Sequence, residues 1–215
     1  TAFDGEYTVY TDYINVYLDP INDLPVLNDI GNQSTNEDIQ LTINLSANDV
    51  DGDILSFAAV SVDISFVSVF VNDNQLTLIP TNNWFGSVDI SVTVSDGELT
   101  DSEIFEFTVT PVNDVPVLAA VGDQDTAEDE PLIVTLSASD VDGDSLIFTS
   151  VSYNPENVTA EVTGNQLILT PADNWNVNLN ISVTVSDIES NEIGDELTDS
   201  ETFLLVIDAV PDAPV

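Results

Sequence analysis

The sequence predicts an all-β protein made of tandem seven-stranded Greek-key β-sandwiches that follow one another end to end. Three observations support this: a repeat with a period of 91 residues, apolar residues that alternate with polar ones, and turns rich in Asn, Asp and Gly. Alternation with a period of two is typical of strands that bury one face, and about seven short strands in roughly 90 residues are typical of a β-sandwich.

The repeat extends over most of the chain. Residues 24–57 align without a gap on residues 115–148, and the offset of 91 holds for residues 74–84 and 165–175. After Asp187 the second copy contains a seven-residue insertion, which raises the offset to 98. We therefore expect four segments: residues 1–21 as the C-terminal strands of a preceding repeat, 22–112 as a complete repeat, 113–210 as a second repeat with the insertion, and 211–215 as the start of the next linker.

The alternation also predicts which side chains face the core. In the first repeat these are Leu41, Ile43, Leu45, Val88, Ile90, Val92, Val94, Phe105, Phe107 and Val109. In the second repeat they are Leu132, Val134, Leu136, Leu179, Ile181, Val183, Val185, Phe203, Leu205 and Ile207. Ile14, Val16 and Leu18 continue the pattern in the first segment.

Trp84 and Trp175 occupy the same position in the two repeats, just before a long apolar strand. Such a residue either stacks against a bound carbohydrate or closes one end of the core. Its recurrence at the same position favours the core, where large aromatic side chains contribute most to packing.

The charge of the chain restricts its partners. It contains 40 Asp and Glu and no Lys, Arg or His, for a net charge of −40, while 43% of its residues are hydrophobic. That apolar content predicts a folded core rather than a disordered acidic chain. Without cationic side chains there is no surface for nucleic acid or anionic lipid, and no apolar run is long enough for direct membrane insertion. No side-chain salt bridge is possible, so neutralisation depends on salt or on bound cations.

Negative charge is densest in one loop of each repeat. The second copy reads DVDGD, with Asp140, Asp142 and Asp144 within five residues, and the first copy is identical. An EF-hand would need Gly at loop position 6 and Glu at position 12, whereas this loop has Gly143 at position 4 and Val151 at position 12. The loop is therefore not an EF-hand.

Each repeat resembles a cadherin-type domain of the bacterial tandem kind, found in large surface adhesins and fibres. The matching motifs are the linker INDLP or VNDVP, the A-x-D-x-D loop at residues 47–52 and 138–143, and Asp96-Gly97 before the last strand. Glu37 and Glu128 stand where the family has an N-terminal Glu. The resemblance covers essentially the whole chain, although Pro20 and Pro111 replace the first Asp of the linker motif.

This resemblance implies Ca²⁺ where one repeat meets the next, held by residues of both repeats and of the linker. Before the first complete repeat the implied ligands are Asn22, Asp23, Asp49, Asp51 and Asp96. Between the two repeats they are Glu37, Asn113, Asp114, Asp140, Asp142 and Asp187. The composition agrees, because Ca²⁺ takes six to eight oxygen ligands, whereas typical Zn²⁺ and Cu²⁺ sites need His or Cys.

A solvated acidic turn is the alternative, because Asp and Gly are common in turns. A turn needs only one or two such residues, which favours calcium. Asp53 and Asp144 either add a ligand or cap the turn. We expect other acids, such as Glu98, Asp101, Glu103 and Asp195, to form a solvated face.

Together these expectations describe a calcium-rigidified stalk or spacer at the cell surface, whose partners are the neighbouring repeats of the same chain. The alternative is that the repeats bind a glycan or another copy of the chain, with exposed Tyr7, Tyr10, Tyr13, Tyr17 or Tyr153 as candidates. We do not expect an enzyme, because a general acid needs a pocket that raises its pKa, and these acids cluster in turns.

Overall fold

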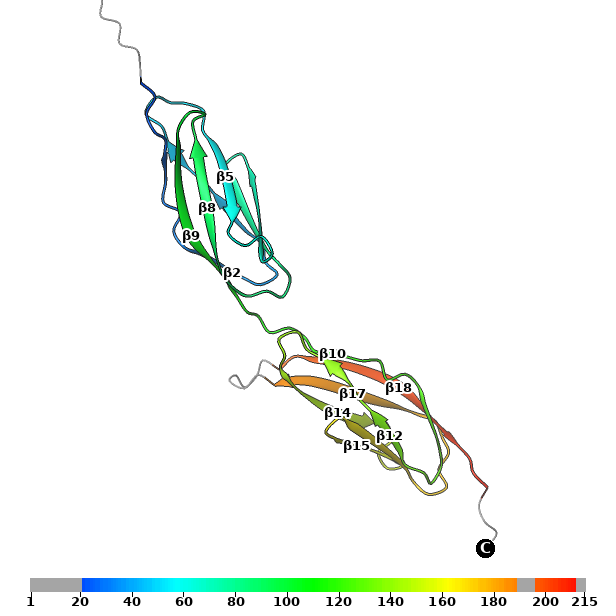
Figure 1. The fold of residues 1–215 in the computed structure, drawn as a ribbon. Coiled ribbons are helices and arrows are strands. Elements are labelled where there is room, and N and C mark those ends of the chain that lie inside the picture. The colour runs from blue at the N-terminus through cyan, green and yellow to red at the C-terminus, as the bar shows by residue number, and fades with distance from the viewer. Residues whose placement is uncertain (1–20, 189–195, 212–215) are drawn as a thin grey trace, which may run out of the picture. The chain divides into compact units, whose positions relative to one another are not determined.

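A computed structural model describes residues 21–188 and 196–211 of the chain (Figure 1). It divides into two compact units, Thr1–Thr110 and Pro111–Val215. All regular structure within the described residues is β-strand. Residues 1–20, which carry nearly all of the expected C-terminal strands of a preceding repeat, lie outside the described residues. So do residues 189–195, which carry the insertion, and residues 212–215 of the next linker.

The first unit is a sandwich of a four-stranded and a three-stranded sheet, with a short pair of strands at one end. The larger sheet has the order β2 (Gln33–Asn36), β9 (Thr100–Thr110), β8 (Gly86–Ser95), β5 (Ser56–Ser61). The smaller sheet has the order β3 (Leu41–Asn44), β7 (Gln75–Pro80), β6 (Val67–Asn72), and the pair is β1 (Val26–Leu27) with β4 (Ala47–Asn48).

The second unit repeats this topology strand for strand. Its larger sheet has the order β11 (Gln124–Ala127), β18 (Thr198–Asp208), β17 (Leu179–Ile188), β14 (Ser145–Ser152). Its smaller sheet has the order β12 (Leu132–Thr135), β16 (Gln166–Pro171), β15 (Val158–Thr163), and its short pair is β10 (Val117–Leu118) with β13 (Ala138–Ser139).

The all-β sandwich expected from the sequence is therefore present, with nine strands in the described part of each unit where seven were expected. The difference arises because the first two strands of each repeat are broken. In the first unit β1 pairs antiparallel with β4, and after a bend at Gly31, which has a φ of 64°, β2 pairs parallel with β9. The second expected strand is divided into β3 and β4 around Leu45, whose N–H donates to the Asn74 carbonyl at 2.7 Å.

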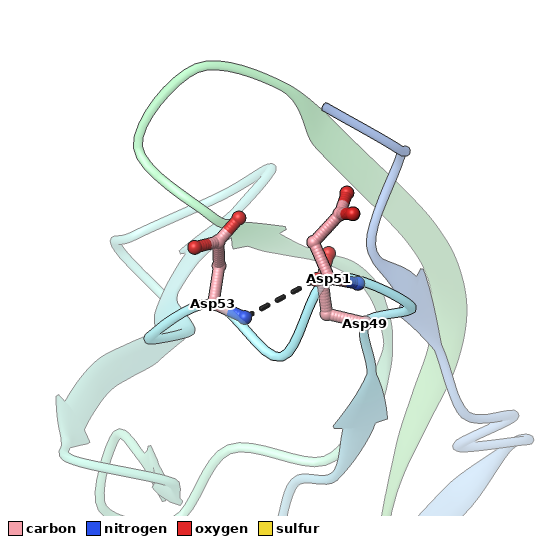
Figure 2. A group of neighbouring side chains, drawn as sticks. All are labelled: Asp49, Asp51 and Asp53. Carbon is pink, nitrogen blue, oxygen red and sulfur yellow. Dashed lines mark hydrogen bonds between the residues drawn. The ribbon is translucent and has the colours of Figure 1, made fainter. Parts of the chain in front are cut away.

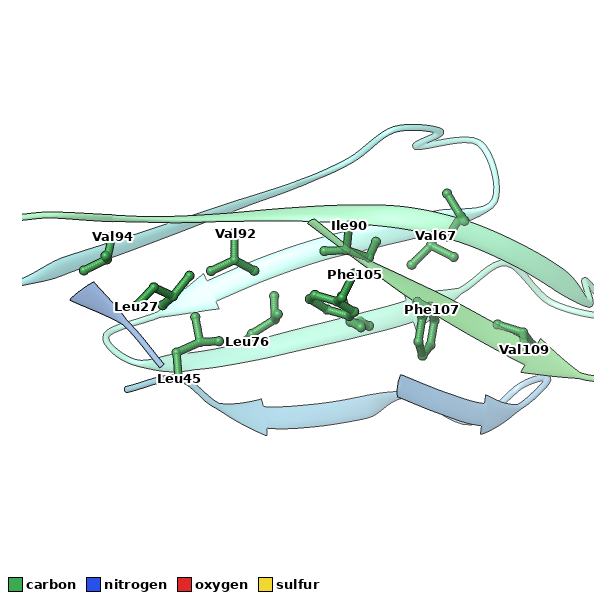
Figure 3. Close-up of a cluster of buried hydrophobic side chains, with 12 residues drawn as sticks. Leu27, Leu45, Val67, Leu76, Ile90, Val92, Val94, Phe105, Phe107 and Val109 are labelled. Carbon is green, nitrogen blue, oxygen red and sulfur yellow. The ribbon is translucent and has the colours of Figure 1, made fainter. Parts of the chain in front are cut away.

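Each unit has its own apolar core, built from the faces that the alternation predicts. In the first unit, Phe105, Phe107 and Val109 of β9 belong to one cluster with Leu76 of β7, and all four are at most 2% exposed (Figure 3). In the second, Phe203, Leu205 and Ile207 take the corresponding places. Trp84 and Trp175 are half-buried and pack against these cores, which supports the structural interpretation of both residues.

Candidate metal centre

The acidic loop between β4 and β5 is folded by its own first aspartate. Asp49 Oδ1 accepts hydrogen bonds from the backbone N–H groups of Asp51, Gly52 and Asp53 at 2.9, 3.0 and 3.2 Å. Gly52 has a φ of 79°, a conformation that costs glycine little. This turn brings the carboxylates of Asp49, Asp51 and Asp53 to the same end of the unit (Figure 2).

Linker residues are attached directly to this loop and to the β8–β9 turn. The side-chain nitrogen of Asn22 donates to Asp96 Oδ2 at 2.9 Å, and the backbone N–H of Asp23 donates to Asp51 Oδ2 at 2.7 Å. Asn22, Asp51, Asp53, Asp96 and Glu98 together line one pocket. The structure thus brings together the five residues expected to bind an ion before the first complete repeat, and it adds Asp53.

The second unit builds the same arrangement from its own residues. Asp140 Oδ1 accepts from the N–H groups of Asp142, Gly143 and Asp144 at 2.9, 3.1 and 3.4 Å. Asn113 donates to Asp187 Oδ2 at 3.1 Å, and the N–H of Asp114 donates to Asp142 Oδ2 at 2.7 Å. The two repeats share the DVDGD loop and the Asn-Asp of the linker, and both form the same set of contacts.

The aspartate next to the linker Asn is held by the backbone of the turn that precedes the last strand. Asp96 Oδ1 accepts from the N–H groups of Glu98 and Leu99, both at 2.7 Å. Asp187 Oδ1 accepts from Leu197 N–H at 2.8 Å, and Asp187 is fully buried. A buried carboxylate in a chain without cationic side chains needs compensation, which hydrogen bonds or a bound cation can supply.

Two aspartates show opposite electrostatic environments. Hydrogen bonds from the Leu99 and Glu98 backbone lower the pKa of Asp96, partial burial opposes this, and the Asn22 amide lowers it further. The pKa of Asp144 is raised by loss of hydration and then by the charges of Asp140, Asp142 and Asp187. The ionised Asp144 is therefore in an unfavourable position that a nearby cation would relieve.

The loop carboxylates lie close enough together to contact one cation. One oxygen from each of Asp49, Asp51 and Asp53 lies within 4.8 Å of the others, and the same holds for Asp140, Asp142 and Asp144. Ca²⁺–oxygen distances of 2.3 to 2.6 Å allow ligand atoms of one ion to lie up to about 5 Å apart. Asp49 Oδ2, Asp140 Oδ2 and Asp144 Oδ2 are buried and accept no hydrogen bond within the described part of the chain.

Glu37 lies at the opposite end of its unit. Its backbone N–H donates to the carbonyl of Thr110 at 2.9 Å, at the end of β9, whereas Asp96 precedes the start of β9. β9 has 11 residues, and at about 3.3 Å per residue its ends are about 33 Å apart. Glu37 is 4% exposed, and Glu128, its counterpart, accepts from the Val210 N–H at 2.7 Å. The structure thus separates Glu37 from the Asn22 site of the same unit.

Two acids of each last strand have a role that the sequence analysis missed. Asp101 Oδ2 accepts from Leu27 N–H at 2.9 Å, and Glu103 accepts from Ile30 and Gly31 N–H at 3.0 to 3.3 Å. Asp199 and Glu201 make the matching contacts in the second unit. The expectation of a solvated face was therefore wrong for Asp101 and Glu103. Glu103 and Asp101 lie two and four residues before Phe105 in β9, so their side chains point to the same face of the strand. This alternation in the sequence could have placed them on the inner face.

One of the five tyrosines considered as binding candidates lies within the described residues. Tyr153 is 60% exposed, whereas Tyr7, Tyr10, Tyr13 and Tyr17 lie outside the described residues, as does Asp195. Glu98 is exposed beside Asp96. Within the described residues the structure contains no helix that could cross a membrane.

The fold and the repeated loop define a class of protein, a tandem array of Ig-like or cadherin-like β-sandwich repeats. Among solved structures, human protocadherin-24 EC1-2 is similar, with 15% identity, a TM-score of 0.55 and coverage of 88% of this chain and 100% of that chain. Drosophila N-cadherin EC1-4 is 14% identical, with a TM-score of 0.54 and coverage of 87% of this chain and 50% of that one. A search of the curated proteins found no match.

Residues 22–108 and 113–198 each match the bacterial Ig domain family, and the chain belongs to that family. Together with the cadherin-like fold, this confirms the resemblance to bacterial tandem cadherin-like repeat proteins. Domains of this kind are typically extracellular, non-enzymatic and structural.

Proposed function

We propose that this chain is a calcium-rigidified stalk or spacer segment of a large bacterial surface adhesin or fibre. One observation carries the proposal: both units form the same contacts between the linker and the repeat that follows it. The linker Asn donates to the aspartate before the last strand, and the backbone of the linker Asp donates to the acidic loop. A cation on these residues would hold the linker as well as the loop. Linker stiffness is the property on which a stalk depends.

The residues that would hold Ca²⁺ differ in which of their oxygen atoms already accept hydrogen bonds. Asp49 and Asp140 each use Oδ1 to fold the loop and retain a buried Oδ2, so they can ligate an ion without breaking the turn. Asp51 and Asp142, and the neighbouring Asp53 and Asp144, supply further carboxylate oxygens. The side-chain nitrogen atoms of Asn22 and Asn113 donate hydrogen bonds to Asp96 and Asp187. These hydrogen bonds do not involve the side-chain amide oxygen of either Asn.

The bound ion would supply positive charge that offsets the repulsion among these carboxylates. The chain offers no cationic side chain for this purpose, because it has no Lys, Arg or His. Glu37 and Asp114 remain proposed ligands of the junction between the two repeats. The burial of Glu37 at the end of its unit that leads into the next linker supports this assignment.

Calcium removal tests the proposal directly. We expect the chain with saturating Ca²⁺ to melt at a higher temperature than in EDTA, and its small-angle scattering to report a narrower distribution of end-to-end distances. Ca²⁺ binds only a folded loop, so it stabilises the folded state by mass action. An unchanged melt together with an unchanged scattering profile in EDTA would contradict the proposal.

A matched pair of variants separates specific sites from simple charge neutralisation. Asp51→Asn with Asp142→Asn removes one loop carboxylate from each unit, and we expect it to abolish most of the Ca²⁺ effect. Asp29→Asn with Asp173→Asn removes the same charge from exposed positions outside the loops. If both pairs respond to Ca²⁺ alike, the ions act as a diffuse atmosphere and the site assignment is wrong.

A further inference from the structure

The larger sheet of the first unit ends in an open strand, β5. This strand pairs with β8 on one side, and within the described residues no strand pairs with its other side. The N–H of Val62 donates to the Asp89 carbonyl at 3.0 Å, which fixes the residues whose backbone groups point toward β8. Because these groups alternate in direction along an antiparallel strand, those of Phe57, Ala59 and Ser61 point to the open side. This edge can therefore accept a further strand.

The β5 edge lacks the features that usually protect an open strand. Natural edge strands are shielded by charged side chains, by Pro, by bulges or by short length. Residues 56–61 contain no acid and no Pro, although the chain carries 40 Asp and Glu in 215 residues. All six residues of β5 pair with β8 without a bulge, whereas the edge strands β2 and β3 have four residues each. The fold therefore leaves this edge available for pairing.

Apolar side chains are exposed along the same edge. Val60 of β5 and Val62 just after it are 63% and 73% exposed, and both lie on the outer face of the sheet. Ile54 and Ile64, which flank the strand, are 93% and 79% exposed. By comparison β6, the edge of the smaller sheet, exposes one large apolar side chain, Phe70. Open backbone groups and exposed apolar side chains thus occur together at β5, as in surfaces that bind an added strand.

The β5 strand is complementary to itself in an antiparallel arrangement. A two-fold axis at Ala59 would place Phe57 of one copy opposite Ser61 of the other, with all their free backbone groups facing each other. The three facing pairs would form about six backbone hydrogen bonds, two for each pair. On the outer face, Val60 of each copy would stand opposite Ala58 of the other, close enough for apolar contact.

The same register would keep the acids that flank β5 away from one another. Asp53 of one copy would stand opposite Ser65 of the other. Asp63 would stand opposite Leu55. Like charges directly opposite each other destabilise a sheet, and between residues 53 and 65 this register opposes none. A second copy of the chain therefore fits this edge despite its high negative charge.

We propose that β5 pairs antiparallel with β5 of a second copy of this chain, so that two four-stranded sheets become one continuous sheet. At both ends of the contact, Ile54 of one copy lies near Ile64 of the other. Two chains with a net charge of −40 repel each other, which favours contact at a surface without acids such as β5.

The pairing adds an assembly role to the proposed stalk and does not rest on the calcium sites. A contact of one short strand from each copy buries less area than the roughly 1,200 Å² of a stable interface, so the dimer is weak and forms at high local concentration. Such concentrations arise where many copies stand on one surface.

Sedimentation equilibrium of the full chain in saturating Ca²⁺ tests the pairing, at protein concentrations from about 10 μM to about 1 mM, which suit a weak interface. We expect the mean mass to rise from that of the 23.1 kDa monomer toward that of a dimer. Added NaCl should strengthen the dimer, because the contact is uncharged and salt screens the repulsion between the copies. A mass that stays at the monomer value at every concentration and salt level would overturn the proposal.

Charge substitutions on exposed side chains test the register. Val60→Asp places an acid of each copy within the contact and should weaken the dimer at least tenfold. A fluorescently labelled Val60→Asp chain should return to the dimer when an excess of Ala58→Lys is added, because position 60 of one copy faces position 58 of the other. Phe70→Lys adds the same charge on β6 and should not restore the dimer.

Matched variants show whether another edge is responsible. Val151→Asp and Phe70→Asp place the same charge at exposed positions of β14 and β6, and both should leave the dimer unchanged. If either weakens the dimer as much as Val60→Asp does, the copies associate through another edge and the proposal is wrong. It is also wrong if Ala58→Lys and Phe70→Lys restore the labelled dimer equally, since the effect is then one of net charge.

Discussion

The side chain of Asn22 is hydrogen-bonded to the carboxylate of Asp96 at 2.9 Å, across 74 residues of sequence. Asn113 and Asp187 make the same contact at 3.1 Å, also 74 residues apart. The linker is therefore attached to the turn before the last strand of the repeat it enters. A change at this contact should affect ion binding and linker order together.

Asp187→Asn should weaken Ca²⁺ binding by the second unit at least tenfold. The substitution keeps the size of this fully buried side chain and removes its negative charge. A tenfold loss of affinity corresponds to about 1.4 kcal/mol of binding free energy. This is a modest loss for removing one carboxylate ligand of a divalent ion. Isothermal titration calorimetry should show one weakened class of site and one unchanged class, because Asp96 still serves the first unit.

Asp173→Asn is the control for this experiment, since Asp173 is exposed and lies outside the loop. If Asp187→Asn leaves both classes of site unchanged, Asp187 has only the structural role of accepting the Leu197 and Asn113 hydrogen bonds.

Asp144→Asn should have opposite effects with and without calcium. Burial and the charges of Asp140, Asp142 and Asp187 raise the folded-state pKa of Asp144, so its ionisation destabilises the metal-free fold. In EDTA at neutral pH the variant should therefore be more stable than the natural chain. The difference should shrink as pH falls through the raised pKa and vanish below the ordinary aspartate pKa of about 3.9, where both states are protonated.

With saturating Ca²⁺ the order should reverse, because the variant loses a carboxylate that has a buried Oδ2 and an oxygen within 4.8 Å of oxygens of Asp140 and Asp142. Urea unfolding across the pH range, in EDTA and in Ca²⁺, measures both effects. A variant that remains more stable in Ca²⁺ would show that Asp144 caps the turn and is not a ligand.

The sequence was sufficient for the features that depend on local pattern. The core faces of β8 and β9 follow from alternation, and the Asp49 and Asp140 loops follow from the repeated DVDGD. The proximity of Asn22 to Asp96 was available only through the resemblance to a known family, because no local rule connects residues 74 positions apart.

Features that depend on strand register could not be predicted in this way. The opposition of Asp89 and Glu106 requires the pairing of β8 with β9, and the stacking of Phe66 on Trp84 requires the packing of two turns. Asp101 and Glu103 are intermediate, because their parity was visible in the sequence while their acceptance of the Leu27 and Ile30 N–H groups was not.

Glu103→Ala should destabilise the first unit by about 1 to 3 kcal/mol, because the N–H groups of Ile30 and Gly31 lose their acceptor in a partly buried position. Urea unfolding should give the same loss in Ca²⁺ and in EDTA, since these contacts are separate from the metal centre. Glu103→Gln retains an oxygen acceptor and should recover part of the stability. Asp125→Ala removes an exposed charge in the second unit and should change the stability little. A loss that appears only in Ca²⁺ would mean that Glu103 is coupled to the ion.

Gly86→Ala should destabilise the first unit by more than the backbone strain alone. Gly86 has a φ of 146°, and a Cβ at this position would lie 3.0 Å from Cζ2 of Trp84. Unfavourable backbone conformations cost about 1 to 3 kcal/mol, and the contact would also displace Trp84 from its place between the core and Phe66. Gly164→Ala is the control, because Gly164 has a φ of 61° with no atom within 4 Å of the added Cβ. Thermal unfolding followed by Trp fluorescence should show a larger loss for Gly86→Ala. Equal losses would mean that Trp84 moves aside without cost.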